Sequence, residues 1–361
     1  MSSDSKVSAG LLRLDSLQIL RAIAAFAVLV FHLGDSLVRD FGMFATNPFE
    51  IGAHGVDMFF VISGFIICYA SKDSSSSIEF AKKRIFRIRP LYYLLTFGVF
   101  AIALVAPQLL NSTEANFVNL AKSLAFIPYE AANGLVQPLL FLGWTLNFEM
   151  FFYLLFAICI GLRHREIVVG LVVVAIALTG LWVDFGHVIP DFFSRSIILN
   201  FAWGVAVFLV YKHMPSLIAK LRWLWVPAAV FILMQLIWPI PLSGEFSIGV
   251  PSAIILLSVL PQNKISGPVG DGVKLIGDAS YSLYLVHPYV IQACVKVIIP
   301  LLGGGILAIA LLSVLSIIGS IVASVLLFKL VEKPSNLWLR KHFLNSSGKT
   351  LVGDQTAPSG V

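Results

Sequence analysis

The chain contains several uninterrupted apolar stretches that reach or exceed the ~18–20 residues a helix needs to cross a ~30 Å hydrocarbon core. Of its 361 residues, 58% are hydrophobic and only 12% are charged, whereas a soluble domain carries roughly a quarter charged residues. This composition excludes a soluble enzyme and a disordered protein. The long runs also exclude an outer-membrane barrel, which is built from short alternating strands. The sequence therefore predicts an all-α, polytopic integral membrane protein.

Ten membrane-spanning helices are expected, and the distribution of positive charge orients them. The expected spans are 15–34, 52–71, 90–110, 141–162, 166–184, 195–211, 222–240, 246–261, 278–299 and 305–330. Twenty of the 25 Lys and Arg residues fall in segments on the same side as the N-terminus, and cytoplasmic loops are enriched in these residues. Both termini are therefore expected in the cytoplasm.

This topology gives one membrane domain at 14–335, a cytoplasmic N-terminal segment at 1–13 and a polar cytoplasmic tail at 336–361. The net charge of +6 reflects orientation in the membrane, because the basic residues are spread over many loops and form no single groove. Nucleic-acid binding is not expected. No metal site is expected either, because the histidines show no ligand spacing such as H-E-x-x-H.

The informative residues are polar ones inside apolar spans, since a charge at a helix centre costs on the order of 2.5–3.5 kcal/mol to insert. The first span contains Arg21 and His32, eleven residues apart. Eleven residues make about three turns, so both side chains lie on one helix face, ~16 Å apart along the axis. Histidine suits proton transfer near neutral pH. The alternative is a packed helix whose imidazole bonds a neighbouring carbonyl.

The next two polar clusters lie around the second and third spans. Asp57 is a costly carboxylate at the outer end of the second span, whereas Ser63 and Gly64 suit close helix packing. Arg84 and Arg87 are three residues apart and share a helix face. They suit either a phosphorylated ligand or contact with anionic lipid. Pro90 follows, and it suits the first turn of the third span.

The fourth span contains Glu149 in an apolar run, with Asn147 beside it and Tyr153 one turn away on the same side. A carboxylate in lipid needs a partner or a proton, so a functional role is favoured. Asn200 lies inside the sixth span. In the ninth span His287 precedes a proline, so it suits either catalysis or a hydrogen bond to a backbone carbonyl that the proline frees.

Five segments follow one another in a familiar order. They are LRAIAAFAVLVFH, GVDMFFVISGFII, KRIFRIRPLYY, GWTLNFEMFFYLLF and GDASYSLYLVHP. Together they resemble acyltransferase family 3, a family of integral-membrane acyltransferases, over about residues 14 to 335. Within that family the chain looks most like the bacterial exopolysaccharide O-acetyltransferases of the succinoglycan type. Relatives often have a second acidic residue where this chain has Met150, which argues against an obligatory pair of glutamates.

The resemblance implies transfer of an acetyl group from acetyl-CoA to a hydroxyl of an envelope glycan in the bacterial inner membrane. The acceptor is either free or lipid-linked, and no permanently bound cofactor is implied. The essential family residues fall on positions 21, 32, 84, 87, 144 and 149, which are Arg21, His32, Arg84, Arg87, Trp144 and Glu149.

The residues and the resemblance lead to one mechanistic hypothesis. The arginines would hold the CoA phosphates, and His32 would act as general base or as a transient acyl acceptor. Glu149 or Asp57 would orient the imidazole, and Asn147 or Trp144 would donate to the oxyanion. Tyr153, Asn200 and His287 complete the candidate site.

Three alternatives stay open: a transporter of lipid-linked glycans, an acyltransferase with a non-glycan acceptor, and a succinyl donor. The sequence does not indicate the oligomeric state.

Overall fold

The structure is a computed structural model that describes residues 14–71, 76–110, 113–261, 267–303 and 305–344. The described residues form helices and connecting turns, with one isolated antiparallel bridge between Glu130 and Val136 and no strand. The prediction of an all-α protein is confirmed. The expected N-terminal segment 1–13 and the end of the expected tail lie outside the described residues.

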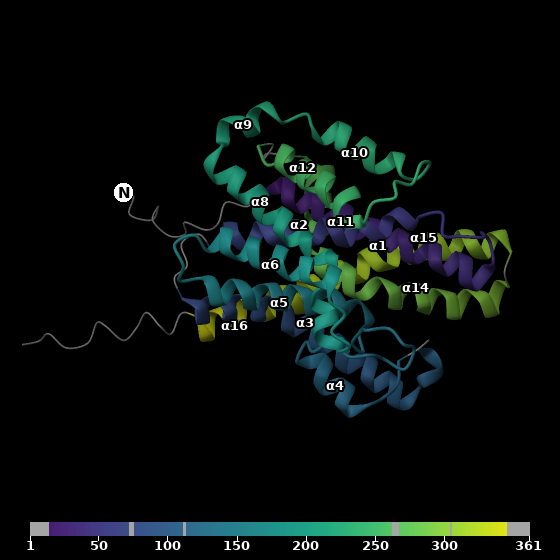
Figure 1. Ribbon diagram of the computed structural model, residues 1–361. Helices are drawn as coiled ribbons and strands as arrows, with labels where there is room; N and C mark the ends of the chain where they lie inside the picture. The colour runs from purple at the N-terminus through teal and green to yellow at the C-terminus, as the bar shows by residue number, and fades with distance from the viewer. Residues whose placement is uncertain (1–13, 72–75, 111–112, 262–266, 304, 345–361) are drawn as a thin grey trace, which may run out of the picture.

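The α-helices follow in chain order, and most of the long ones run side by side along one direction (horizontal in Figure 1). Their bounds are α1 Asp15–Phe41, α2 Gly55–Ala70, α3 Ser77–Val105, α4 Phe117–Leu124, α5 Trp144–Cys159, α6 Arg165–Trp182, α7 Val188–Phe193, α8 Leu199–His213, α9 Pro215–Lys220, α10 Trp225–Met234, α11 Gly244–Ser247, α12 Gly249–Val259, α13 Pro268–Asp278, α14 Ser280–Leu302, α15 Ile306–Leu327 and α16 Lys333–Phe343. Short 3-10 turns cover Glu50–His54, Pro107–Leu109, Phe141–Gly143 and Ser196–Ile198, and a π-helical turn covers Phe328–Glu332.

Eight helical segments within the described residues are long and apolar enough to cross a membrane. They are Asp15–Phe41, Glu50–Ala70, Ser77–Val105, Phe141–Cys159, Arg165–Trp182, Ser196–His213, Ser280–Leu302 and Ile306–Phe343. The polytopic membrane architecture is therefore confirmed, and eight of the ten expected spans have a matching helix.

The other two expected spans, 222–240 and 246–261, contain shorter helices. Helix α10 has 10 residues, which is about 15 Å and only half of a ~30 Å hydrocarbon core. Pro239 and Pro241 follow soon after α10 and cannot continue it. The second segment is divided into the short helix α11 and the 11-residue α12.

Helix α3 begins thirteen residues before Pro90, so the prediction that Pro90 lies in a first turn is wrong. The Ser76 side chain accepts a hydrogen bond from the Glu79 amide (3.2 Å) and caps the helix at that point. The proline lies inside the resulting 29-residue helix. As a consequence, Arg84 and Arg87 belong to the same continuous helix as the membrane span.

The helices near the candidate site are fixed by close backbone contacts. Helices α1 and α14 run parallel, since Gly277 packs on Gln18 just before α14 begins, and His287 contacts His32 further along. Helix α13 is held against the start of α1 by Lys274, which lies 2.8 Å from Asp271 and 3.4 Å from Asp15. Hydrogen bonds to these two carboxylates raise the pKa of Lys274 above its usual value.

Helices α2 and α8 approach each other through glycines. A Cβ atom at Gly64 would lie 2.3 Å from the Phe201 carbonyl oxygen, and one at Gly204 would lie 2.1 Å from the Val61 carbonyl oxygen. Both contacts are with backbone, which cannot move away cheaply. The packing role expected for Gly64 is confirmed, whereas Ser63 takes part in a hydrogen bond described below.

Gly64→Ala should therefore destabilise the protein by on the order of 1–3 kcal/mol, because the added methyl group overpacks the contact. Gly98→Ala is the matched control, since nothing lies within 4 Å of a Cβ at Gly98 in α3. Alanine there should leave stability equal or raise it by about 0.5–1 kcal/mol. Thermal unfolding in detergent measures both changes, and equal shifts for the two variants would contradict the close contact of α2 with α8.

Candidate active site

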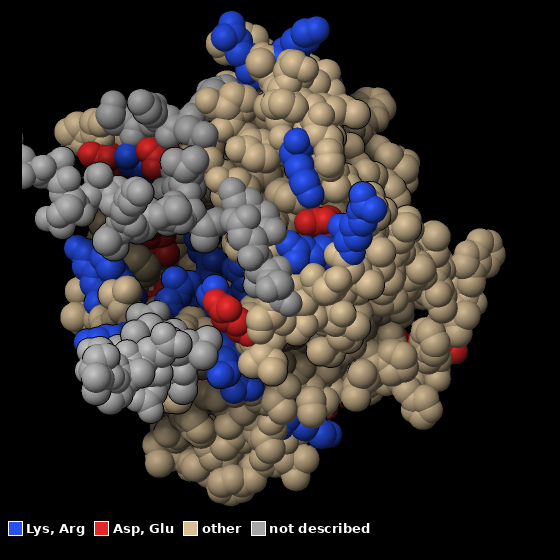
Figure 2. Space-filling view, turned by 90° about the vertical axis from the view of Figure 1, so that its left-hand side faces the viewer, with Lys and Arg blue, Asp and Glu red and all other residues tan. Residues whose placement is uncertain are grey.

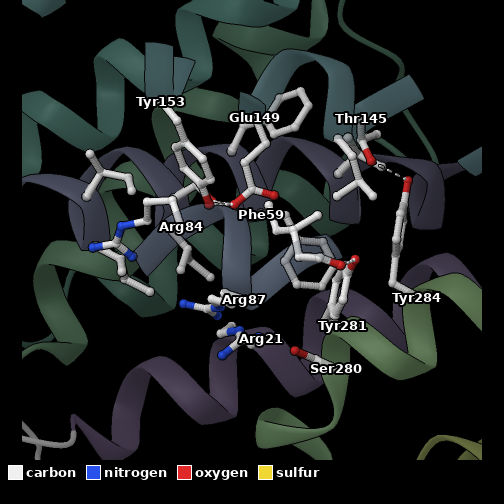
Figure 3. Close-up of a pocket in the computed structure, with 18 residues that line it drawn as sticks. Arg21, Phe59, Arg84, Arg87, Thr145, Glu149, Tyr153, Ser280, Tyr281 and Tyr284 are labelled. Carbon is white, nitrogen blue, oxygen red and sulfur yellow. Dashed lines mark hydrogen bonds between the residues drawn. The ribbon is translucent and has the colours of Figure 1, made fainter. Parts of the chain in front are cut away.

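A cavity lies among α1, α2, α3, α5 and α14, and charged and hydroxyl side chains line part of its walls (Figure 3). Its polar lining residues are Arg21, Ser63, Arg84, Arg87, Thr145, Glu149, Tyr153, Ser280, Tyr281 and Tyr284. The cavity volume is about 80 Å³, several times the ~10–15 Å³ that one water molecule requires. Charged groups in this cavity can therefore meet water or a polar ligand.

Three arginines converge on one side of this cavity. Arg21 comes from α1, and Arg84 and Arg87 come from α3, as their shared helix face predicts. Arg21 donates a hydrogen bond to Gln18 (3.2 Å). The Arg84 guanidinium lies 5.5 Å from the centre of the Phe80 ring, and its buried Nε has no hydrogen-bond partner among the described residues. The three cations keep hydrogen-bonding capacity for an anionic ligand.

The arginines lie toward one end of the molecule. Figure 2 views the end near α16 and shows Lys and Arg side chains gathered on it. Helix α16 packs against α3, and the exposed basic residues of these two helices include Lys82, Lys83, Arg89 and Lys341. This is the end that the positive-inside rule assigns to the cytoplasm.

Glu149 lines the same cavity. The Ser63 hydroxyl donates to Glu149 Oε1 (3.1 Å), and the Tyr153 hydroxyl donates to the same oxygen. No hydrogen bond joins Glu149 to His32 among the described residues. The structure therefore pairs the carboxylate with hydroxyl groups beside the arginines, and not with the imidazole that it was expected to orient.

Thr145 and Tyr284 form the opposite side of the cavity from the arginines (Figure 3). Their hydroxyl oxygens are 3.1 Å apart, and Thr145 also donates to the Leu142 carbonyl (3.0 Å). The Tyr284 ring lies 6.3 Å from the His287 ring. This hydroxyl pair therefore links the cavity to the imidazoles one helical turn further along α14.

His32 and His287 face each other across the contact of α1 with α14. His32 Nδ1 lies 3.2 Å from His287 Nε2, and their ring centroids are 5.0 Å apart. His32 Nδ1 is also 2.9 Å from the Val28 carbonyl oxygen, and His287 Nδ1 is 2.9 Å from the Leu283 carbonyl oxygen. His287 is fully buried, whereas His32 is half-buried. Both functions considered for these residues remain compatible with the geometry, since each ring bonds backbone and the two rings meet.

Asp57 and Asn200 belong to a separate cluster. Asp57 Oδ2 is 2.7 Å from His54 Nδ1, and Asp57 Oδ1 accepts a hydrogen bond from Asn200 Nδ2 (2.6 Å). Asp57 is buried and His54 is partly exposed. The structure brings Asp57 together with an imidazole, but with that of His54 and not that of His32.

Trp144 and Asn147 lie near the start of α5 but do not line the cavity. Asn147 is buried, and its Oδ1 has no hydrogen-bond partner among the described residues. At 100° per residue, Asn147 points about 200° away from Glu149 on the helix. Thr145 is the residue that shares the face of Glu149, and its i−4 spacing could have revealed it.

Glu332 is a buried acidic residue that the sequence patterns did not reveal. It ends the π-helical turn Phe328–Glu332, is 6% exposed and accepts a hydrogen bond from Ser282 Oγ (2.7 Å). Its charge interacts with those of Arg87 and Arg21. Such turns are frequent at functional sites, and this one supplies a counter-charge to the arginines. No group of three or more potential metal-ligating side chains occurs among the described residues.

Comparison with known proteins gives one family. Residues 14–325 match the model of the acyltransferase domain family. The chain is 34% identical over 261 residues to the exopolysaccharide production protein ExoZ of Rhizobium meliloti (strain 1021), covering 69% of this chain and 80% of that protein. It is 26% identical to acyltransferase MdmB of Streptomyces mycarofaciens (89% of this chain, 91% of the relative) and to nodulation protein 10 of Rhizobium leguminosarum bv. viciae (89% and 93%). No solved structure matches the chain.

The cavity can be tested by cysteine labelling in a background lacking Cys68, Cys159 and Cys294. Ser63→Cys should react with a small water-soluble methanethiosulfonate, because Ser63 lines the cavity. Ser320→Cys in α15 is the control, since Ser320 is fully buried and lines no part of that cavity. We expect at least tenfold faster labelling at position 63. Equal rates would show that the cavity does not admit water-soluble molecules.

Proposed function

The chain belongs to the acyltransferase domain family, and we propose that it moves an acetyl group from acetyl-CoA to a sugar hydroxyl of an exopolysaccharide or another envelope glycan. The proposed location is the bacterial inner membrane. The observation that carries the proposal is a polar cavity with three arginines on one side and the hydroxyl pair that leads to His32 and His287 on the other.

The arginine side suits the nucleotide end of acetyl-CoA. Guanidinium groups form charge-assisted, often bidentate hydrogen bonds with phosphate oxygens. Arg84 and Arg87 come from α3, which packs against α16 at the end where Lys and Arg side chains gather (Figure 2), so the phosphates would enter from the cytosol. Glu149 and Glu332 offset part of the arginine charge before the donor arrives.

The acetyl end would follow the contact between α1 and α14. Arg21 and His32 are eleven residues apart on α1, which is ~16 Å at 1.5 Å per residue. The pantetheine arm is long and thin. Neither imidazole lines the cavity, so the arm would pass Thr145 and Tyr284 to reach them. The thioester would then lie near the imidazole pair.

In the proposed chemistry, His32 accepts the proton of the sugar hydroxyl while the hydroxyl oxygen attacks the thioester carbon. The C–S bond breaks, and the CoA thiolate takes the proton from His32. A transient acetyl group on His32 is the other form of the same proposal. Tyr284 lines the cavity and its ring lies 6.3 Å from the His287 ring, so its hydroxyl is a proposed oxyanion donor beside Trp144 and Asn147. The Thr145 hydroxyl donates to the Leu142 carbonyl instead.

The catalytic proposal predicts that His32→Gln strongly slows acetyl transfer. Purified protein in nanodiscs should move radiolabelled acetyl from acetyl-CoA to the host glycan, and the variant should be slower by roughly 10²–10⁴-fold. Mass spectrometry of exopolysaccharide from cells with and without the protein identifies the acceptor. No turnover of acetyl-CoA by the wild type would favour a transporter, and an unchanged acyl content would remove the glycan as acceptor. A succinylated glycan would show that the donor carries a succinyl group and not an acetyl group.

The donor-binding proposal predicts that Arg84→Gln and Arg87→Gln each raise KM for acetyl-CoA. A hydrogen bond to a charged group contributes about 1.5–3 kcal/mol, so the rise should be about 10–100-fold. Arg89→Gln is the matched control on the same helix, because Arg89 is exposed, stacks near Tyr93 (5.7 Å) and does not line the cavity. An equal rise for Arg89→Gln would indicate a general surface-charge effect and contradict a specific phosphate site.

A further inference from the structure

We propose that His287 is the positioning residue for His32, and that it makes Nε2 of His32 the atom that reacts. This inference rests on the proposed function and adds the tautomer and the partner that set the reacting nitrogen. The reacting nitrogen depends on which ring nitrogens carry protons, and the backbone carbonyls decide this.

A carbonyl oxygen only accepts hydrogen bonds, so any ring nitrogen bonded to one must carry a proton. His287 Nδ1 lies 2.9 Å from the Leu283 carbonyl oxygen, and His32 Nδ1 lies 2.9 Å from the Val28 carbonyl oxygen. Both imidazoles therefore carry their proton on Nδ1 when they are neutral. Their Nε2 atoms are then bare lone pairs.

This assignment also satisfies the contact between the two rings. His287 Nε2 lies 3.2 Å from His32 Nδ1. A bare Nε2 on His287 accepts a hydrogen bond from the Nδ1–H of His32. The same Nδ1–H also points to the Val28 carbonyl, so the two acceptors share this proton. The opposite tautomer of either ring would leave a carbonyl facing a lone pair. The hydrogen bonds therefore run in one direction: His32 donates to His287, and His287 donates to the Leu283 carbonyl.

The remaining nitrogen, His32 Nε2, has no hydrogen bond among the described residues. The His32 side chain is half-buried and its Nε2 is not among the fully buried polar atoms that lack a partner, so we take this nitrogen as the one that the thioester would reach. An accessible, bare and oriented nitrogen is what a general base or nucleophile requires. His287 thus has the position that a carboxylate has beside a catalytic histidine in other enzymes, with the Leu283 carbonyl behind it.

The proton balance closes for both forms of the reaction. As a base, His32 Nε2 takes the hydroxyl proton and returns it to the CoA thiolate, while Nδ1–H stays bonded to His287. As an acyl acceptor, Nε2 attacks the thioester carbon, the thiolate leaves, and the Nδ1 proton passes to His287 Nε2. The sugar hydroxyl then attacks the acetyl carbon, its proton goes to the thiolate, and His287 returns its proton to Nδ1 of His32.

The test compares His287→Gln with His287→Leu. The Gln side chain places an amide oxygen near the site of Nε2 and can accept from His32 Nδ1–H, whereas Leu fills the space and cannot. Leu should lower kcat about 100-fold or more while KM for acetyl-CoA changes less than about threefold. The kcat of His287→Gln should be at least a tenth of the wild-type kcat. His342→Leu is the control, because His342 also bonds the carbonyl four residues earlier but meets no second imidazole (Trp338 O, 2.9 Å).

Thermal unfolding in detergent checks that the variants fold. For folded variants, a kcat of His287→Leu within threefold of the wild type would overturn the proposal, as would a Gln variant no faster than the Leu variant.

A second measurement separates this proposal from the proposed function. Solid-state ¹⁵N NMR of histidine-labelled protein in liposomes should show His32, assigned by its loss in His32→Gln, as the Nδ1–H tautomer. The fraction of His32 in the Nδ1–H tautomer should fall in His287→Leu. An Nε2–H signal in the wild type would overturn the tautomer assignment even if acetyl transfer is found. Failure of acetyl transfer with the Nδ1–H signal present would count against the proposed function only.

Discussion

The structure depends on one constraint: a charged or polar group inside an apolar helix bundle must have a partner or face water. Arg21, Arg84 and Arg87 meet this requirement by lining a common cavity with two carboxylates near them. His32 and His287 meet it by bonding backbone carbonyls and each other. These groups come from helices far apart in sequence. The hydrogen bonds and charge contacts between them therefore determine how α1, α3, α5 and α14 are placed. The same groups have the chemistry that an acyl transfer from a phosphorylated donor requires.

Those parts of the account that follow from local periodicity could be predicted from the sequence. Run length predicts the membrane helices, and the small residue at Gly64 predicts a close helix contact, whose partner α8 only the structure shows. The shared face of Arg84 and Arg87 follows from a three-residue spacing. The prediction for Pro90 is wrong, and the helices in the expected spans 222–240 and 246–261 are shorter than predicted. Hydropathy registers apolar length but not where a cap begins a helix or where prolines end one.

The partners of the site residues could not be predicted, because they depend on the mutual placement of distant helices. Spacing along the chain gives the face of a side chain but not the group opposite it. The partner of Asp57 is His54, which is only three residues away in the sequence. The partner of His32 is His287, which lies 255 residues later. Glu332 escaped notice because the π-helical turn, which ends at this residue, has no periodic signature. Thr145 was overlooked although its spacing from Glu149 was readable.

The most direct test of the account is a cryo-electron-microscopy structure of the protein in nanodiscs with a thioether analogue of acetyl-CoA that cannot be cleaved. The account predicts that the phosphates contact Arg21, Arg84 and Arg87. It also predicts that the acyl carbon lies within about 3.5 Å of His32 Nε2, the distance of a reactive complex. An analogue bound outside the cavity, or one whose acyl end lies away from His32, would contradict it.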